Sequence, residues 1–203
     1  AAVTNISGMF YNCYSLQTVP LFNTAAVTTM TYMFYSCYSL QTVPLFNTAA
    51  VTDISFMFYS CYSLQTVPLF NTAAVTNISG MFVNCYSLQT VPLFNTAAVT
   101  NMSSMFYNCY SLQAVPSLNV SAVTSSSNFS SMFSGCRSLI RIQASRFNYT
   151  FSVASCKLSA TALNEIYTNL PTVTGQTITV TGNWGTATDT PSIATAKGWT
   201  VTG

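Results

Sequence analysis

The chain has 203 residues, of which 50% are hydrophobic and only 4% are charged, and its formal net charge is +2. This composition excludes a disordered chain, because disorder goes with low hydrophobicity and high charge, and no apolar run approaches the roughly 20 residues needed to span a membrane. Residues 1–136 hold one charged side chain, Asp53. Without a basic surface to neutralise phosphates, we expect no nucleic-acid partner, and we expect no transmembrane segment.

A repeat of 24 residues organises the first two thirds of the chain. The block CYSLQTVPLFNTAAVT occurs four times unchanged, at 13–28, 37–52, 61–76 and 85–100, and eight variable residues separate successive copies. A period between 20 and 50 residues is typical of solenoids, in which each coil buries its apolar side against its neighbours. The sequence therefore predicts stacked coils.

Each block contains the spacing LxxLxL, which is typical of the strand of a leucine-rich repeat. This pattern predicts that Leu16, Val19 and Leu21 point inward and that Phe22 points outward. Pro20 removes a donor from the strand ladder, so we expect the strands to be short and irregular.

The stretch AVTNISGMFYNCYSLQTVP (Ala2–Pro20) and its copies resemble the BspA-type leucine-rich repeats, or DUF285 family, of bacterial surface proteins and phage virion proteins. The resemblance extends from Ala1 to about Ile142. It implies a solenoid fold and extracellular display, and it implies no chemistry. The family pattern usually has Asp at the positions that hold Asn here, namely Asn23, Asn47, Asn71 and Asn95.

The period is lost after Gln143. Residues 159–170 read as a helix with Ser159 as its cap, 177–181 as a strand and 182–185 as a turn. A short helix from Pro191 to Gly198 and a strand at 199–202 complete the chain. We therefore predict a mainly β repeat protein: a leucine-rich-repeat solenoid of 24-residue coils over 1–142, with an irregular α+β C-terminal cap over 143–203. Because Ala1–Thr4 repeats the end of the block, we expect either a longer parent protein or end-on docking to another subunit.

The cysteines recur with the repeat and form one column along the predicted stack: Cys13, Cys37, Cys61, Cys85, Cys109 and Cys136. We interpret this column as a structural ladder of buried, reduced thiols, since free Cys packs as a small hydrophobe. Disulfides between neighbouring coils remain an alternative, because the expected coil spacing falls within disulfide range. A metal site is not expected, because zinc sites need clustered ligands and the chain has no His.

The sequence contains few side chains that could act in catalysis. General acid–base chemistry needs His or a tuned carboxylate, and the only carboxylates are Asp53, Glu165 and Asp189, far apart in the chain. We expect a protein that is not an enzyme and that binds no cofactor.

Two sets of residues are candidates for binding a ligand or partner. The first is a row at the outward position of the repeat, Phe22, Phe46, Phe70 and Phe94, which is either an exposed aromatic strip or is tucked into the core by the preceding prolines. The second lies in the variable segments, where one position changes from Gly8 and Gly80 to Tyr32 and Phe56, with Asp53 nearby. Tyr32, Phe56 and Asp53 are the predicted local binding site, and sequence drift at an outward position is the alternative.

These features favour a non-enzymatic structural and adhesive protein. It would be displayed on a phage virion, as a fibre or appendage, or on a bacterial surface, and would bind a host-surface protein or glycan. The alternative is a filament subunit that stacks end to end through uncapped coil ends. In either case we expect an extracellular location and a homo-oligomer or larger assembly.

Overall fold

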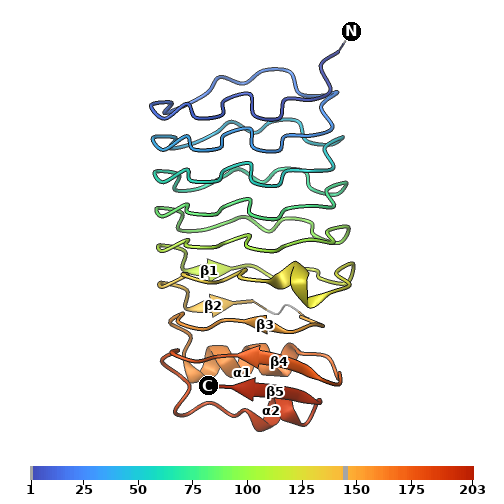
Figure 1. Cartoon of the computed structure of the whole chain (residues 1–203), viewed down its shortest axis with the longest axis vertical. Helices are drawn as coiled ribbons and strands as arrows, with labels where there is room; N and C mark the ends of the chain where they lie inside the picture. The colour runs from blue at the N-terminus through green and yellow to red at the C-terminus, as the bar shows by residue number, and fades with distance from the viewer. Residues whose placement is uncertain (1, 144–145) are drawn as a thin grey trace.

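A computed structural model describes residues 2–143 and 146–203. Ala1, on which the expectation about the start of the chain partly rests, and residues 144 and 145 of the predicted C-terminal segment lie outside the described residues. Successive repeats lie one above another along the long axis, with the N-terminus at one end and the C-terminus close to the other (Figure 1). Parallel β-bridges join positions one repeat apart, from Asn5 to Thr29, Asp53, Asn77 and Asn101 in turn.

Backbone hydrogen bonds connect each coil to the next at fixed positions. The N–H of Thr28 donates to the carbonyl of Thr4, and its copies Thr52, Thr76 and Thr100 donate to the coil before them over 2.7–2.9 Å. On another part of the coil the bonds run the other way, as from Gly8 N–H to Thr31 O at 2.9 Å. The constant period of 24 residues allows the same bonds to recur, because each of these coils meets the next in the same register.

Proline explains why the predicted strands are irregular. Strand β1 (Ala114–Val115) pairs in parallel with β2 (Arg141–Ile142), and the ladder continues where Gln143 N–H donates to Val115 O at 2.9 Å. In the earlier coils the position of Gln143 is held by proline, which has no N–H to donate: Pro44, Pro68, Pro92 and Pro116. The ladder therefore extends into a strand pair at β1 and β2, where Gln143 replaces the proline.

The core is a continuous cluster of buried side chains that runs from Ile6 to Trp199. Its centre is a column of near-parallel phenylalanine rings with centroids 5.3–6.1 Å apart: Phe10, Phe34, Phe58, Phe82, Phe106 and Phe133. Columns of Met, Cys and Leu lie beside it, and their members from the second coil onward are almost fully buried. Burial of this apolar surface is the main favourable term in folding.

The direction of two side chains in each coil was predicted wrongly. Leu21 and its copies, expected inside, are 58–65% exposed, whereas Phe46, Phe70 and Phe94, expected outside, are only 2–5% exposed. In two of the coils the cause is a three-residue turn, in which Phe70 N–H bonds to Pro68 O at 2.9 Å and Phe94 N–H to Pro92 O at 3.0 Å. Such a γ-turn breaks the alternation of an extended strand and sends its central leucine outward.

The C-terminal part has more regular elements. The three-residue insertion of the fifth repeat forms a 3-10 turn, η1 (Ser126–Phe129). Strands β3 (Phe151–Ser152), β4 (Gln176–Thr179) and β5 (Trp199–Thr202) form one parallel sheet. Helices α1 (Ala160–Asn169) and α2 (Ser192–Thr195) contact each other. The predicted helices and strands of this part are therefore confirmed to within a few residues, and the short sheets with few helices confirm the mainly β class.

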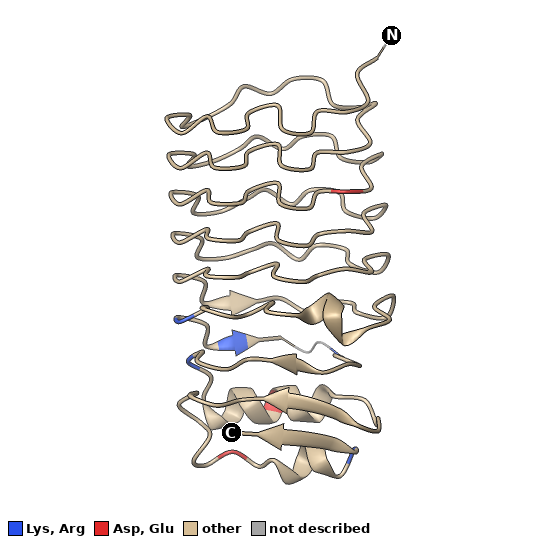
Figure 2. Ribbon diagram, viewed as in Figure 1, with Lys and Arg blue, Asp and Glu red and all other residues tan. Residues whose placement is uncertain are grey.

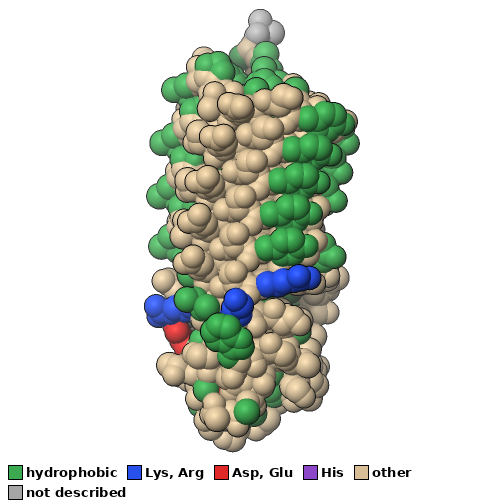
Figure 3. Space-filling view, turned by 90° about the vertical axis from the view of Figure 1, so that its left-hand side faces the viewer, with side chains coloured by type: hydrophobic (Ala, Val, Ile, Leu, Met, Phe, Trp, Pro, Cys, Tyr) green, Lys and Arg blue, Asp and Glu red, His purple; other side chains and the backbone are tan. Residues whose placement is uncertain are grey.

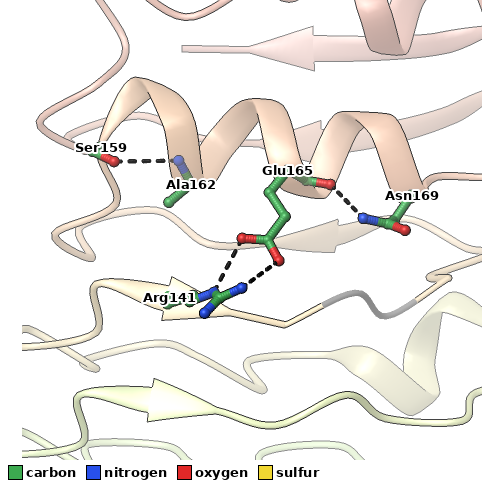
Figure 4. Close-up of polar contacts among 5 residues, drawn as sticks. All are labelled: Arg141, Ser159, Ala162, Glu165 and Asn169. Atoms are coloured by element: carbon green, nitrogen blue, oxygen red, sulfur yellow. Dashed lines mark hydrogen bonds and ion pairs between the residues drawn. The ribbon is translucent and has the colours of Figure 1, made fainter.

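Side-chain contacts hold the first of these helices in place. Ser159 accepts the N–H of Ala162 and caps the start of α1, and Glu165 on α1 bonds bidentately to Arg141 of β2 at 3.1 Å (Figure 4). At the other end, the ammonium of Lys197 donates to the carbonyls of Tyr167, Thr168 and Leu170. A cation is favourable there because the last carbonyls of a helix lack internal partners.

Candidate functional site

The carboxylates do not form a common site. Asp53 lies in the third coil, far from Glu165 and Asp189 in the C-terminal part (Figure 2). Its two oxygens accept the N–H of Ser55 at 2.8 Å and the amide of Asn77 at 3.2 Å. Asp189 accepts the hydroxyl of Tyr167 at 2.7 Å, and burial, followed by this bond, raises the pKa of Tyr167. Each carboxylate thus has a bond that organises the local chain.

The cysteine column is a ladder of thiols that bond to backbone. Cys37, Cys61, Cys85, Cys109 and Cys136 are buried, and each donates its S–H to the carbonyl of a phenylalanine in the preceding coil over 3.1–3.2 Å. Burial raises the pKa of the Cys37 thiol to about 12 and raises those of the others as well. All the cysteines are free, and Cys13 is the exposed one because no described coil lies over it. The expectation of burial is therefore wrong for Cys13.

Two rows of large side chains stand on the surface of the repeats. The leucine row comprises Leu21, Leu45, Leu69 and Leu93, all more than half exposed. The tyrosine row is a stack of rings with centroids 4.6–4.9 Å apart: Tyr14, Tyr38, Tyr62, Tyr86 and Tyr110. Arg137 lies over the last ring at 5.1 Å. Figure 3 shows a row of hydrophobic side chains that runs down one face and ends at a basic side chain.

The variable position singled out from the sequence has an unusual backbone. Gly8, Tyr32, Phe56, Gly80, Ser104 and Ser131 all have φ between +54° and +65°. This left-handed region costs a residue other than glycine roughly 1–2 kcal/mol, and a bulky side chain is rarely found there. Tyr32 and Phe56 therefore stand where the backbone favours glycine, and strained residues of this kind cluster at functional sites.

Tyr32 and Phe56 are brought together, and they join a larger group. Their rings stack at 5.2 Å with an interplanar angle of 2°. Beside them runs a second stack, Tyr11–Tyr35–Tyr59, with spacings of 4.6 and 4.5 Å, and tilted contacts at 5.8 and 6.2 Å connect the two. We call these five rings the aromatic cluster. Its members are half-buried or exposed, so it is an accessible surface.

The aromatic cluster has sharp limits along the stack. In the fourth coil Gly80 replaces Phe56 and Val83 replaces Tyr59, and in the first coil Gly8 stands where Tyr32 would be repeated. Burial, then the neighbouring phenols of Tyr59 and Tyr11, raise the pKa of Tyr35, so this phenol stays neutral near pH 7. The cluster offers apolar rings and neutral hydroxyls. The carboxylate of Asp53, the third predicted member, is engaged with Ser55 and Asn77 instead.

The phenylalanine candidates do not form a surface. Phe46, Phe70 and Phe94 are buried, and Phe22 of the first coil is half-buried. Phe46 packs on Phe34 at 6.3 Å and Phe70 on Phe58 at 6.4 Å, inside the core. Of the two alternatives for this row, the exposed aromatic strip is therefore wrong, and the tuck into the core after proline is confirmed for Phe46, Phe70 and Phe94.

Comparison with known proteins gives a family but no characterised relative. The chain matches the family model described as "Mycoplasma protein of unknown function, DUF285" over residues 1–91 and 41–147. The chain belongs to the DUF285 family. Searches of the curated proteins and of the solved structures found no match.

The Asn residues of the repeated block stabilise a turn in each coil. The side-chain oxygens of Asn23, Asn47, Asn71 and Asn95 each accept the backbone N–H two residues ahead over 3.0–3.1 Å. An Asp carboxylate could accept the same bond. Four carboxylates stacked one coil apart would repel one another, whereas four amides do not. The Asn row therefore keeps the turn and leaves this DUF285 chain uncharged on that side.

A groove between the repeats and the C-terminal part of this DUF285 chain was not predicted from the sequence. It has a volume of about 850 Å³ and is lined by, among others, Leu93, Ser117, Arg146 and Asn148. The signal available in the sequence was the change from leucine to Ser117 where the leucine row would continue. Among the described residues, no group of three potential metal ligands occurs and no helix is long and apolar enough to cross a membrane.

Proposed function

We propose that this DUF285 chain is a leucine-rich-repeat solenoid that works as a non-enzymatic structural and adhesive protein outside the cell. It would be displayed on a phage virion, as a fibre or appendage, or on a bacterial surface, and would bind a host protein or glycan through the side of the stack. Support for the solenoid comes from the hydrogen bonds that recur every 24 residues and from the continuous core.

The observation that carries the adhesive role is the exposure of large side chains in rows. The leucine row, the tyrosine row and the aromatic cluster lie within residues 1–136, whose one charged side chain is Asp53. Contiguous exposed apolar surface is uncommon on proteins that act alone and is typical of contact surfaces. Tyrosine in particular supplies a large contact area and a polar hydroxyl at low cost in conformational entropy.

Binding of the labelled chain to a printed glycan array and to immobilised extracellular glycoproteins tests this function. We expect specific, saturable binding to members of at least one of the two sets that weakens little as salt rises, because the repeats have almost no charge. Absence of binding to both sets would refute the adhesive role.

A filament subunit is the second candidate, and one observation favours it. Met9 in the first coil is 53% exposed and Cys13 is exposed, whereas their copies Met33 and Cys37 are fully buried. This end therefore presents core residues that either another coil or a second copy would cover. Negative-stain images of the purified 203-residue chain distinguish the two, because long fibres support end-to-end stacking and discrete particles contradict it.

A further inference from the structure

The position of the tyrosine row continues into the C-terminal part, where it holds cations. In the repeats each tyrosine of the row comes two residues after a position with φ between +57° and +60°. Three later coils keep a left-handed residue at this place, namely Gly135, Ser155 and Gly182. The side chains two residues further on are Arg137, Lys157 and Trp184. The five tyrosines are therefore followed along the stack by two cations and an indole.

Contacts between coils show that the two cations are neighbours inside the stack. The N–H of Lys157 donates at 2.8 Å to the carbonyl of Leu139, which lies two residues after Arg137. On the outer sides, Cζ of Arg137 lies 5.1 Å from the ring centroid of Tyr110, and Nζ of Lys157 lies 5.3 Å from that of Trp184. The two cations therefore stand in successive coils, and each has a ring of a further coil on its other side.

Neither cation has an anionic partner among the described residues. The nearby guanidinium of Arg141 is already held by Glu165, and Asp189 accepts the hydroxyl of Tyr167. Figure 3 shows basic side chains grouped on one face of the molecule, at the end of the hydrophobic row. Two like charges in successive coils repel each other. An anion bound between them would remove this repulsion and add two attractions.

The surroundings of the two cations select a carboxylate that is carried on a partly apolar ring. A guanidinium forms two parallel hydrogen bonds with one carboxylate, and an ammonium adds a compact charge. Ile140, three residues after Arg137, is 50% exposed and supplies an apolar surface. Gln113, whose carbonyl accepts the N–H of Ile140 at 2.9 Å, is exposed and carries an amide that pairs with hydroxyls. An acidic sugar matches all three features, since it combines a carboxylate, a face of C–H groups and several hydroxyls.

We propose that Arg137 and Lys157 together bind the carboxylate of an acidic sugar unit in a glycan. The guanidinium of Arg137 pairs with both carboxylate oxygens, the ammonium of Lys157 donates to one of them, and the sugar ring lies against Ile140. This is a second site, distinct from the leucine row and the aromatic cluster of the proposed function, and it does not depend on them. Because its main attraction is between charges, binding at this site weakens as salt rises, unlike the binding expected of the repeats.

Two variants each replace one charged group by a neutral amide. Arg137→Gln and Lys157→Gln change an exposed and a half-buried side chain, so we expect both chains to fold. Arg137→Lys keeps the charge and loses the paired hydrogen bonds. Arg146→Gln is the matched control, because it removes one positive charge from an exposed residue that lines the groove beside Leu93 instead of the tyrosine row. A thermal melt of each variant confirms that it is folded.

Saturation-transfer NMR titrations with methyl glucuronoside and with the methyl glycoside of N-acetylneuraminic acid measure binding at this site. Methyl glucoside is the matched neutral sugar, and glutamate blocked at both ends is the matched carboxylate without a ring. We expect at least one acidic sugar to bind at least tenfold more tightly than either of these two compounds. Its dissociation constant should rise at least tenfold in Arg137→Gln and in Lys157→Gln, and at least threefold in Arg137→Lys. Raising the salt from about 0.05 M to about 0.5 M should also weaken binding at least threefold, whereas Arg146→Gln should stay within twofold of the natural chain.

Several results would overturn the proposal. It is wrong if neither acidic sugar binds, if methyl glucoside binds as tightly as they do, or if either glutamine variant binds normally. It is also wrong if the blocked glutamate binds as tightly as the acidic sugars, which would indicate an acidic segment of a protein as the ligand.

The same variants on the glycan array and the glycoproteins separate this proposal from the proposed function, provided that acidic and neutral glycans are scored apart in every comparison. Binding to neutral glycans or glycoproteins that survives both glutamine variants, without any signal from an acidic sugar, refutes this site and leaves the adhesive role of the repeats standing. Binding to acidic glycans that disappears in both glutamine variants, without any other binding, supports this site and refutes the adhesive role of the rows and the aromatic cluster.

Discussion

The two glycines of the variable column give a sharp test of how the coils pack. Gly8→Ala and Gly80→Ala both place a Cβ on a left-handed backbone, at φ +65° and +59°, and this costs about 1 kcal/mol each. Only at Gly80 does the new Cβ also collide with a ring, that of Phe56 at 2.3 Å. Overpacking of this kind adds about 1–3 kcal/mol. We therefore expect a loss of about 1 kcal/mol for Gly8→Ala and of about 2–4 kcal/mol for Gly80→Ala.

A double-mutant cycle isolates the collision. In a Phe56→Ala background the ring is gone, so Gly80→Ala should cost only the backbone term, and the coupling between the two positions should be about 1–3 kcal/mol. Urea unfolding in the presence of a thiol reductant, followed by circular dichroism and tyrosine fluorescence, gives these free energies. The packing described here is refuted if Gly80→Ala costs the same with and without Phe56.

Four further predictions concern the core, the thiols, which carry two of them, and the turns. Phe70→Ala should lower the free energy of unfolding by about 3–5 kcal/mol and Leu69→Ala by less than about 0.5 kcal/mol; equal losses in urea unfolding would contradict the inward turn of phenylalanine. In native protein Cys13 alone should react quickly with Ellman's reagent, and fast labelling of Cys61 or Cys85 would show that the column is open. Burial raises the pKa values of the buried thiols in the folded state. Their contribution to stability is therefore complete below the unfolded pKa of about 8.5 and is lost as the pH rises toward about 12. A melting temperature that stays constant across this pH range would contradict this prediction. Asn71→Ala should cost about 1 kcal/mol because Ala73 N–H loses its acceptor, whereas Asn71→Asp should cost less at moderate salt, and the reverse order in urea unfolding would argue against the turn.

Much of the fold follows from the sequence because the repeat makes each position meet its own copy. The columns of Met, Phe and Cys, the cap at Ser159 and the last strand could all be predicted from periodicity and local chemistry. The outward direction of the leucines could not, since alternation along a strand assumes an extended backbone and the γ-turns at Pro68 and Pro92 are local exceptions. The inward turn of the phenylalanines was one of the two alternatives that the prolines suggested.

The candidate site was predictable in part. Variation from glycine to aromatic identified Tyr32 and Phe56 as unusual, but the sequence did not show that their column is left-handed or that Tyr11, Tyr35 and Tyr59 lie beside them. The carboxylate of Asp53 bonds to the turn and to Asn77, and its part in binding stays a prediction. Proximity between neighbouring columns depends on the path of the coil, which periodicity alone does not determine.

We propose that the aromatic cluster of the variable segments contributes more to binding than the leucine and tyrosine rows of the identical blocks, which form the scaffold. A chain in which residues 29–36 and 53–60 are replaced by the sequence of 77–84 (NISGMFVN) makes the second and third coils identical to the fourth and removes the aromatic cluster except Tyr11. Binding of this chain and of the natural one to the same glycan array and glycoproteins, at matched folded concentration, is the most direct test. We expect an unchanged fold by circular dichroism and a loss of binding of at least tenfold, whereas undiminished binding by a folded chain would show that the aromatic cluster is not the main binding surface.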